Sequence, residues 1–362
     1  MAHHRATRAE INLKAFKHNL QNLKTVLGSK TDIMAVIKAD AYGHDASKVA
    51  QALSPHVKLF AVGFIDEALT LRQDGITNPI LILEGPFKES DFAIAQKHNF
   101  VLMLHSEYQI NWLSSLTQAF TCDIWIKVET GMNRLGFAIE KIEQVILQLS
   151  PQQKSQLVLC SHFSTAEQIN SDKPVQQLAK LMELVKKHDC KFSMANSAGI
   201  LNWPESHGDF TRLGLALYGI SPIATTPLSQ ALIPVMTLSA NIIAIHKVAI
   251  GETVGYGDTW QAKRESIIAT VAIGYADGYP RNTKSGTPVF VKQQVAPLVG
   301  RVSMDMITID ITDLSSINIG DSVELWGKNI NIDTVAQQSD SINYELLTRV
   351  SKRVPKVIEQ SQ

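Results

Sequence analysis

The sequence predicts an α/β fold in two domains: an N-terminal (β/α)8 barrel of the TIM type, then a mostly antiparallel β domain. Three observations lead to this prediction. Short apolar runs alternate with helical segments over the first part of the chain, and eight such runs can be counted. Beyond about Leu228 the pattern changes to strand-like runs separated by turn residues. The 362 residues are sufficient for two domains of ordinary size.

The first predicted element is an amphipathic helix. Asn12 is a suitable N-cap, and Gly28 follows the end of the helix. Its apolar side chains recur every three or four residues along one face, at Leu13, Phe16, Leu20, Leu23 and Leu27.

The eight predicted barrel strands are short apolar runs, as expected of strands that are buried on both faces. A typical intervening helix covers Pro174–His188, with a proline in its first turn. A doubly wound open sheet is the alternative, but no G-x-G-x-x-G follows the first strand. The runs are Ile33–Lys38, Leu59–Phe64, Ile80–Leu83, Phe100–Leu104, Cys122–Val128, Leu157–His162, Phe192–Ala195 and Leu213–Leu217.

The second domain is expected to be β-rich and to end with a helix over Ile342–Arg349, before Pro355. We place the domains at residues 1–230 and 231–362, because Pro227 and Pro234 flank the change of pattern. The expected strands are Val235–Ile245, Ser266–Ile273, Thr287–Val291, Ile307–Ile311 and Ser322–Leu325.

Composition argues against several classes of protein. Lys plus Arg and Asp plus Glu are both 34, so there is no overall charge to attract nucleic acid or an anionic membrane. The polar start has no signal-peptide pattern, and no apolar stretch reaches membrane-spanning length. The three cysteines are far apart, which argues against a disulfide framework or a metal site. We therefore expect a cytoplasmic protein without a metal ion.

Reactive side chains lie at or near the ends of several predicted strands, where barrel active sites are built. A lysine that ends an apolar strand is well placed to have a lowered pKa and to react as a nucleophile. Singly, each of these residues has an ordinary structural explanation, such as a capping asparagine or a solvated arginine. Their convergence at strand ends favours a functional site. They are Lys38, Arg134, His162, Asn196, Ser197 and Arg212.

The motifs around these residues closely resemble those of bacterial alanine racemases, and they occur in the family's order from residue 36 to residue 350. The resemblance implies a fold-type III enzyme that uses pyridoxal phosphate (PLP) and interconverts L-alanine and D-alanine, supplying D-alanine for peptidoglycan. It also implies a homodimer with shared active sites. The motifs are VIKADAYGH, ETGMNRLGF, SHFSTAE, ANSAG, RLGLALYG, VGYGDTW, GYADGYPR, GRVSMDM, GDSVELWG and INYELLTRV.

The resemblance implies a role for each matching residue toward the cofactor. Lys38 matches the lysine that holds PLP covalently, and Arg212 matches the arginine that faces the pyridine nitrogen. Because arginine does not give up its proton, this nitrogen should stay unprotonated and side reactions such as transamination should be suppressed. The phosphate group is expected to contact Tyr42, Ser197, Gly214, Leu215 and Tyr344, and the rest of the cofactor His162 and Asn196.

Racemisation requires proton transfer on both faces of Cα, and two bases on opposite sides are the simplest arrangement. The resemblance assigns these roles to Lys38 and to Tyr256, the latter contributed by the partner subunit. A free tyrosine titrates near 10, so Tyr256 needs a positive neighbour or a proton relay.

Other matching residues are expected to contact the substrate. Arg134 and the backbone near Met304 match the group that receives the carboxylate, Asp305 should order that loop, and Tyr275 lines the entrance. Lys127 matches a lysine that carries a carbamate in many members of the family. Glu129 departs from the pattern, because aspartate is more usual at this position.

Four alternatives remain at this point. A racemase of broader specificity, acting for example on serine, would have a wider pocket. A PLP-dependent decarboxylase should have a carboxylate where Arg212 stands. A non-catalytic PLP-homeostasis protein would not need the C-terminal domain, and a scaffold without cofactor would show no cofactor absorbance.

Overall fold

The computed structural model describes residues 7–223 and 226–359. These residues divide into two compact units. One unit comprises residues 16–41 and 45–232. The other comprises residues 233–359 together with 7–15 and 42–44. None of the described helices is long and apolar enough to cross a membrane.

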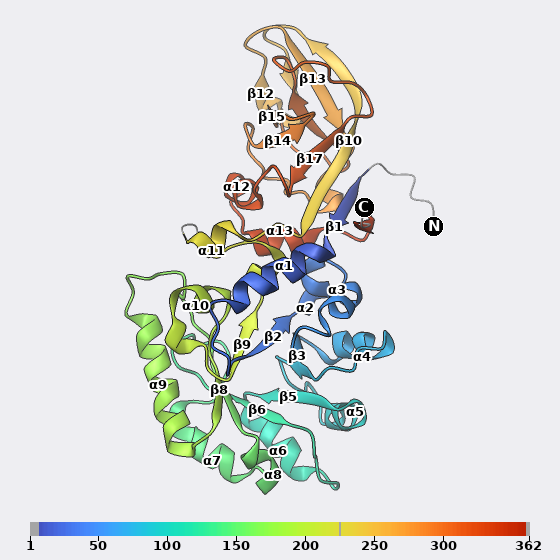
Figure 1. Ribbon diagram of the computed structural model, residues 1–362. Coiled ribbons are helices and arrows are strands. Elements are labelled where there is room, and N and C mark those ends of the chain that lie inside the picture. The colour runs from blue at the N-terminus through green and yellow to red at the C-terminus, as the bar shows by residue number, and fades with distance from the viewer. Residues whose placement is uncertain (1–6, 224–225, 360–362) are drawn as a thin grey trace. The chain divides into compact units, whose positions relative to one another are not determined.

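The first unit is a parallel β/α barrel, which confirms the predicted fold class (Figure 1). All seven strand pairings are parallel, in the order β8-β7-β6-β5-β4-β3-β2-β9. Backbone hydrogen bonds from Asp209 N to Phe192 O (3.1 Å) and from Arg212 N to Ala195 O (3.0 Å) join the two end strands. The open-sheet alternative therefore does not apply. The strands are β2 (Asp32–Val36), β3 (Leu59–Val62), β4 (Ile80–Ile82), β5 (Phe100–Leu104), β6 (Ile124–Lys127), β7 (Val158–Cys160), β8 (Lys191–Ser193) and β9 (Phe210–Leu213).

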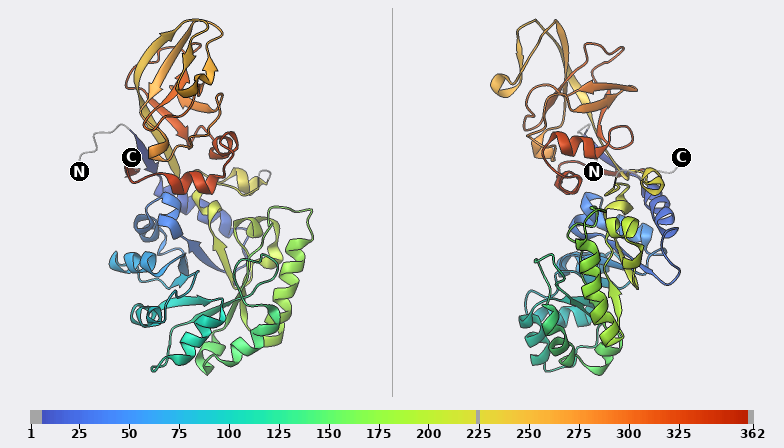
Figure 2. Two further views of the ribbon diagram at one scale, coloured as in Figure 1. Left: turned by 180° about the vertical axis from the view of Figure 1, so that it is seen from behind. Right: turned by 90° about the vertical axis from the view of Figure 1, so that its left-hand side faces the viewer.

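Helices follow most of these strands and cover the outside of the barrel (Figures 1 and 2). Asn12 caps the first helix as predicted, accepting a hydrogen bond from Ala15 N at 3.0 Å. The helices are α1 (Leu13–Lys24), α2 (Lys38–Gly43, whose last two residues group with the other unit), α3 (Ala46–Leu53), α4 (Ile65–Gln73), α5 (Ser90–His98), α6 (Glu107–Ser115), α7 (Ile142–Leu147), α8 (Pro151–Ser155), α9 (Lys173–His188), α10 (Ser197–Asn202) and α11 (Pro227–Gln230).

The last barrel strand begins and ends earlier than predicted. The expected strand was Leu213–Leu217, but β9 ends at Leu213 and a 3-10 helix, η3 (Leu215–Tyr218), follows. Gly214, with φ −111° and ψ −109°, leaves the strand conformation and allows this turn. Arg212 therefore lies inside the strand rather than before it.

The second unit contains an eight-stranded sheet that is mostly antiparallel, as predicted. The exception is the parallel pair of β1 and β18. The long strand β10 pairs with β1 and β17 along its first half and with β13 along its second half (Figure 2). The elements are β1 (Arg8–Ile11), β10 (Met236–Val248), β13 (Ser266–Val271), β14 (Pro288–Val291), β15 (Gln294–Pro297), β16 (Ile307–Asp310), β17 (Ser322–Trp326), β18 (Lys356–Ile358), the small pair β11 (Thr253–Val254) and β12 (Trp260–Gln261), and the helices α12 (Ile332–Gln338) and α13 (Asn343–Arg349).

The N-terminal strand was not foreseen. Residues 8–11 belong to the sheet of the second unit, where they pair with β10 and β18. The domain boundary that we place between residues 230 and 231 stays a prediction. The compact units group residues 7–15 and 42–44 with those from 233 onward.

Candidate active site

Lys38 stands at the carboxyl end of β2, as the sequence predicted, and begins an unusual turn. The next four residues, Ala39 to Tyr42, have φ between 51° and 55°, so α2 is a left-handed turn. L-amino acids in this conformation cost about 1–2 kcal/mol each, because Cβ approaches the following carbonyl oxygen. A turn of this kind persists only where its surroundings hold it, and such strain is typical of functional sites.

Arg212 reaches from β9 to β7 and β8 and is almost fully buried. Its Nη1 donates to Ser193 Oγ at 2.7 Å and to Cys160 Sγ at 3.2 Å. Its Nη2 donates to the carbonyl oxygens of Ser161 (2.6 Å) and Met194 (3.0 Å). These four partners are neutral, so the guanidinium keeps its full positive charge within the barrel.

His162 accepts a further hydrogen bond from Arg212, since its Nδ1 lies 3.1 Å from Nη2. A guanidinium can only donate, so this ring nitrogen carries no proton and the neutral ring is protonated at Nε2. Burial lowers the pKa of His162 well below its usual value, and the positive charges of Arg212, Lys127, Arg134 and Lys38 lower it further. His162 is therefore a neutral hydrogen-bond donor at Nε2 in a positively charged surrounding.

Lys127 ends strand β6 in the same positively charged region. Burial lowers the pKa of its amine to about 8, and the charges of Arg212 and Arg134 act in the same direction. A neutral fraction of this amine is therefore present near neutral pH, which is the form that reacts as a nucleophile.

Arg134 lies in a loop that Glu129 organises. The Glu129 carboxylate accepts hydrogen bonds from the backbone N–H groups of Gly131, Met132 (2.7 Å) and Asn133 (2.8 Å). Burial alone would raise the pKa of Glu129, but these backbone donors outweigh it and hold the pKa below its usual value. The glutamate thus forms an ordered loop at a position where aspartate is more usual in the family.

Ser197, Gly214 and Leu215 come together at the end of the barrel. Ser197 Oγ accepts hydrogen bonds from Gly214 N and Ala216 N, both at 3.2 Å, and Leu215 lies between these two residues. Asn196 precedes this serine and caps α10, accepting from Gly199 N at 2.9 Å. A hydroxyl group among backbone N–H groups is suited to an anionic ligand.

The remaining predicted residues belong to the second unit. The loops of Tyr275 and Met304 are joined by backbone bonds, from Tyr275 N to Ser303 O and from Ala276 N to Met304 O, each 3.0 Å. Asp305 forms an ion pair with Arg353 Nη2 at 2.6 Å, which orders its loop.

Tyr42 and Tyr344 also belong to the second unit, and their ring centroids are 5.8 Å apart. Burial and then the neighbouring Tyr344 raise the pKa of Tyr42, so the Tyr42 side chain is a neutral phenol. By contrast, Tyr256 is 67% exposed and occupies the turn η4 (Tyr256–Asp258).

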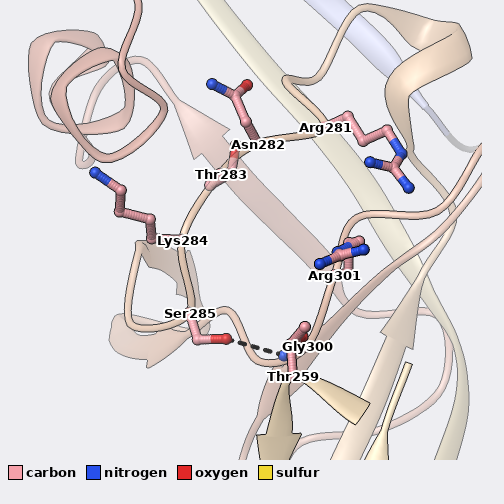
Figure 3. Close-up of a pocket in the computed structure, with 8 residues that line it drawn as sticks. All are labelled: Thr259, Arg281, Asn282, Thr283, Lys284, Ser285, Gly300 and Arg301. Carbon is pink, nitrogen blue, oxygen red and sulfur yellow. Dashed lines mark hydrogen bonds between the residues drawn. The ribbon is translucent and has the colours of Figure 1, made fainter. Parts of the chain in front are cut away.

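A basic pocket of about 490 Å³ adjoins the Tyr256 turn (Figure 3). An added Cβ at Gly257 would lie 3.5 Å from Arg301 Nη1, so this guanidinium approaches the turn closely. Lys284 forms an ion pair with Asp340 at 2.8 Å. The sequence analysis did not single out this pocket, because Arg301 is 17 positions beyond Lys284 and nothing in the sequence indicates that the two lie at one pocket. Its lining residues are Thr259, Arg281, Asn282, Thr283, Lys284, Ser285, Gly300 and Arg301.

Within the part of the chain that the structure describes, no group of three or more His, Cys, Asp or Glu residues could hold a metal ion.

The predicted site residues belong to two sets, one in each compact unit. The barrel holds Lys38, Lys127, Arg134, His162, Asn196, Ser197, Arg212, Gly214 and Leu215, and the second unit holds Tyr42, Tyr256, Tyr275, Met304, Asp305 and Tyr344.

Comparison with known proteins gives one consistent family. Residues 11–222 match the family model "Alanine racemase, N-terminal domain", and residues 235–358 match "Alanine racemase, C-terminal domain". The alanine racemase of Alteromonas mediterranea is 42% identical over 98% of this chain and 99% of its own length. The catabolic alanine racemase of Pseudomonas aeruginosa is 40% identical, with the same coverage.

Solved structures agree with this comparison. The biosynthetic alanine racemase of Pseudomonas aeruginosa superposes with a TM-score of 0.94, at 38% identity, over 98% of this chain and 100% of that structure. The alanine racemase of Acinetobacter baumannii superposes with a TM-score of 0.92, at 37% identity, over 98% of this chain and 100% of that structure. Catabolic and biosynthetic relatives are thus similar to this chain to nearly the same degree.

Proposed function

The chain belongs to the alanine racemase family, and from this premise we propose that it interconverts L-alanine and D-alanine with pyridoxal phosphate as cofactor. The observation that carries the proposal is the arrangement at the barrel end. Lys38 follows strand β2 by two residues there, and the buried Arg212, which has no carboxylate partner among the described residues, donates to His162. This arrangement also argues against the decarboxylase alternative, which requires a carboxylate at the position of Arg212.

The residues present fit the proposed cofactor. Lys38 offers a primary amine just beyond a strand end. The Ser197 oxygen accepts from Gly214 N and Ala216 N, so its own O–H can donate to a phosphate placed near Gly214 and Leu215. We assign the phenols of Tyr42 and Tyr344 to the same phosphate, and Asn196 and His162 to the ring and its substituents. When bound, the cofactor supplies a conjugated ring that takes up the electron pair left on Cα after proton removal.

We assign the two proton transfers to Lys38 and Tyr256. Lys38 Nζ exchanges the proton on one face of Cα, and the Tyr256 hydroxyl exchanges it on the other face. Arg212 would hold a positive charge toward the ring nitrogen of the bound cofactor, which would disfavour protonation of that nitrogen and so limit side reactions. The wide exposure of Tyr256 supports its action in a second subunit, since a base must be shielded from water to act in this way.

We therefore propose a homodimer in which the C-terminal domain, residues 231–362, completes the partner's active site. There Tyr275 narrows the entrance, while Asp305 orders the loop of Met304. Arg134 and the backbone at Met304 receive the substrate carboxylate, because a guanidinium binds a carboxylate through two parallel hydrogen bonds.

We assign a carbamate to Lys127, formed when its neutral amine attacks carbon dioxide and loses a proton. The pKa of about 8 supports this assignment, since a fully protonated amine does not react. The resulting negative charge would hold the guanidinium of Arg134. We further propose that the enzyme works in the cytoplasm and that its D-alanine product enters peptidoglycan.

The test is racemisation in D2O by wild type, Lys38→Ala and Tyr256→Phe, each started from L-alanine and from D-alanine. We expect wild type to racemise both and Lys38→Ala to be inactive. Tyr256→Phe should lose deuterium incorporation selectively from one enantiomer. Serine as a second substrate tests the broader racemase. If wild type binds PLP but leaves alanine unchanged, the proposal fails and a role in PLP homeostasis takes its place.

A further inference from the structure

We propose that Glu67 is a positioning residue for Lys38, holding the left-handed turn that follows it. The inference rests on the proposed function, because it concerns how the lysine of that reaction is presented. Glu67 lies in the first turn of α4, one strand away from Lys38 in the barrel.

The Glu67 carboxylate collects three backbone N–H groups from two different loops. Oε2 accepts from Gly63 at 2.7 Å and from Phe64 at 3.1 Å. Oε1 accepts from Ala39 at 2.6 Å. Two of the bonds are local to the start of α4, whereas the third reaches the residue directly after Lys38.

The local bonds have an ordinary explanation, since a glutamate in the first helical turn often caps the preceding backbone. The bond to Ala39 does not share this explanation, because Ala39 and Glu67 are 28 positions apart in the chain and belong to different elements. Ala39 is the first residue of the left-handed turn, with φ 53°. A charged acceptor fixed at this N–H opposes the return of the turn to the favoured right-handed region.

Packing brings Glu67 close to Lys38 without pairing their charges. An added Cβ at Gly63 would lie 3.2 Å from Glu67 Oε2 and 4.0 Å from Lys38 Cβ. No ion pair joins Lys38 to Glu67 among the described residues. Glu67 therefore acts on the backbone that carries the lysine and leaves its amine free to react.

Asp91 provides a matched control. Its Oδ2 accepts from the backbone of Phe87 (2.8 Å) and Lys88 (3.2 Å), next to α5. It thus performs the local task of Glu67 one strand further round the barrel, with no bond to the Lys38 turn. Replacing it tests the cost of losing such a cap alone.

The experiment compares Glu67→Gln, Glu67→Asp and Asp91→Asn. Gln removes the charge at nearly constant shape, while Asp keeps the charge and shortens the reach. The first readout is the rate at which the PLP-free protein captures added PLP at Lys38. Capture is followed by absorbance and located by borohydride reduction and peptide mass. We expect about tenfold slower capture for both Glu67 variants, because small misplacements of a reacting group are costly. Asp91→Asn should stay within about twofold of wild type.

The second readout is deuterium exchange at Cα from each enantiomer. The Glu67 variants should lose exchange mainly from the enantiomer that Lys38 deprotonates, with kcat lowered more than KM is raised. A merely structural role would lower both exchanges equally, as a smaller folded fraction does.

A rescue variant keeps the test decisive if Glu67→Gln folds poorly. Glycine adopts left-handed φ at little cost, so Ala39→Gly should partly restore capture in the Glu67→Asp background. Equal capture rates for the Glu67 and Asp91 variants, or no rescue, would overturn the inference. A wild type that neither captures PLP nor racemises alanine would instead overturn the proposed function.

Discussion

Lys38 and Tyr256, the two proposed bases, are presented by turns of opposite construction. The Lys38 turn follows the buried parallel strand β2. Just before the turn, Ile37 N donates a hydrogen bond to Ala61 O of strand β3 at 2.9 Å. In the Tyr256 turn the tyrosine lies between Gly255 and Gly257, at φ 81° and 72°, and is 67% exposed. The two glycines adopt these angles without strain, although Asp258 in the same turn has φ 52°. In the Lys38 turn four consecutive non-glycine residues are left-handed, so this turn is strained and must be held.

This difference indicates that the barrel by itself positions Lys38. The position of Tyr256 depends on whatever packs against its exposed turn. A hydrogen bond from Thr253 Oγ1, in β11, to Asp258 Oδ1 at 2.7 Å connects the Tyr256 turn to the preceding strand. A second subunit is the cover that the proposed function requires. The following predictions test this division, in order of decreasing effect.

The largest effect is expected from combining two inactive variants. Lys38→Ala and Tyr256→Phe, co-expressed with different tags, should form mixed dimers in which one of the two shared sites is intact. Such dimers, purified through both tags, should recover about half of the wild-type activity. Each homodimer serves as a control. Mixed dimers that remain as inactive as the homodimers would mean that both bases come from one subunit.

Arg212 should matter for both stability and chemistry. Arg212→Gln removes donors to four buried neutral acceptors and to His162, so we expect the free energy of unfolding to fall by about 2–4 kcal/mol. Racemisation should fall by about tenfold or more, with a larger share of pyruvate from transamination. Chemical denaturation and product analysis measure the two effects. Ser193→Ala, which removes one acceptor, is the control, and an unchanged pyruvate share in Arg212→Gln would contradict the electronic role.

The Tyr256 turn can be disturbed without touching the tyrosine. Gly255→Ala places a side chain at φ 81°, with its Cβ 3.2 Å from Arg301 N. We expect about a fivefold loss of exchange on the Tyr256 face, since a left-handed alanine costs about 1 kcal/mol. PLP capture by Lys38 should be unchanged. Gly251→Ala, also at positive φ but with no atom near the added Cβ, is the matched control. Equal loss on both faces of Cα would argue against separate presentation of the two bases.

Glu129 is expected to act through the position of Arg134. Glu129→Gln weakens its bonds to three backbone N–H groups, so KM for alanine should rise by about threefold while kcat changes less. Glu129→Asp, the residue usual in the family, should stay closer to wild type. Steady-state kinetics in both directions provide the measurement, and a fall in kcat alone would exclude a role in carboxylate binding.

The last prediction concerns stability rather than activity and is a pH dependence that comes from Lys127. Its pKa is lowered from the usual value of 10.5 to about 8 in the folded protein. Between these values the unfolded chain binds more protons than the folded chain, so stability should rise with pH in this window. Lys127→Met should remove this rise. Denaturant unfolding at pH 7.5 and pH 10, without carbon dioxide, measures this rise in the free energy of unfolding. An equal rise in wild type and Lys127→Met would disprove the lowered pKa of Lys127.

Much of the barrel was predictable because its strands are buried on both faces and therefore appear as continuous apolar runs. Strand β1 was not, because the four residues Arg8–Ile11 gain their strand conformation from partners more than 200 positions away. Several barrel residues of the site, such as Lys38 and Arg212, were singled out by their positions near strand ends, whereas their roles and the site residues of the second unit came from motif resemblance. Glu67 was not identified from the sequence, because its local pattern is that of a common helix cap and nothing in the sequence reveals the bond to Ala39.

The pairing of β1 has a consequence for biosynthesis. All strands of the barrel come from one uninterrupted stretch, so the barrel sheet can form while the ribosome is still making the rest. The first strand instead pairs in parallel with β18, at Lys356–Ile358. Residues 8–11 therefore emerge first but must remain without this neighbour until translation has passed residue 358. A nascent chain arrested before that point would expose one edge of β1, which is a known route to association with other unpaired strands.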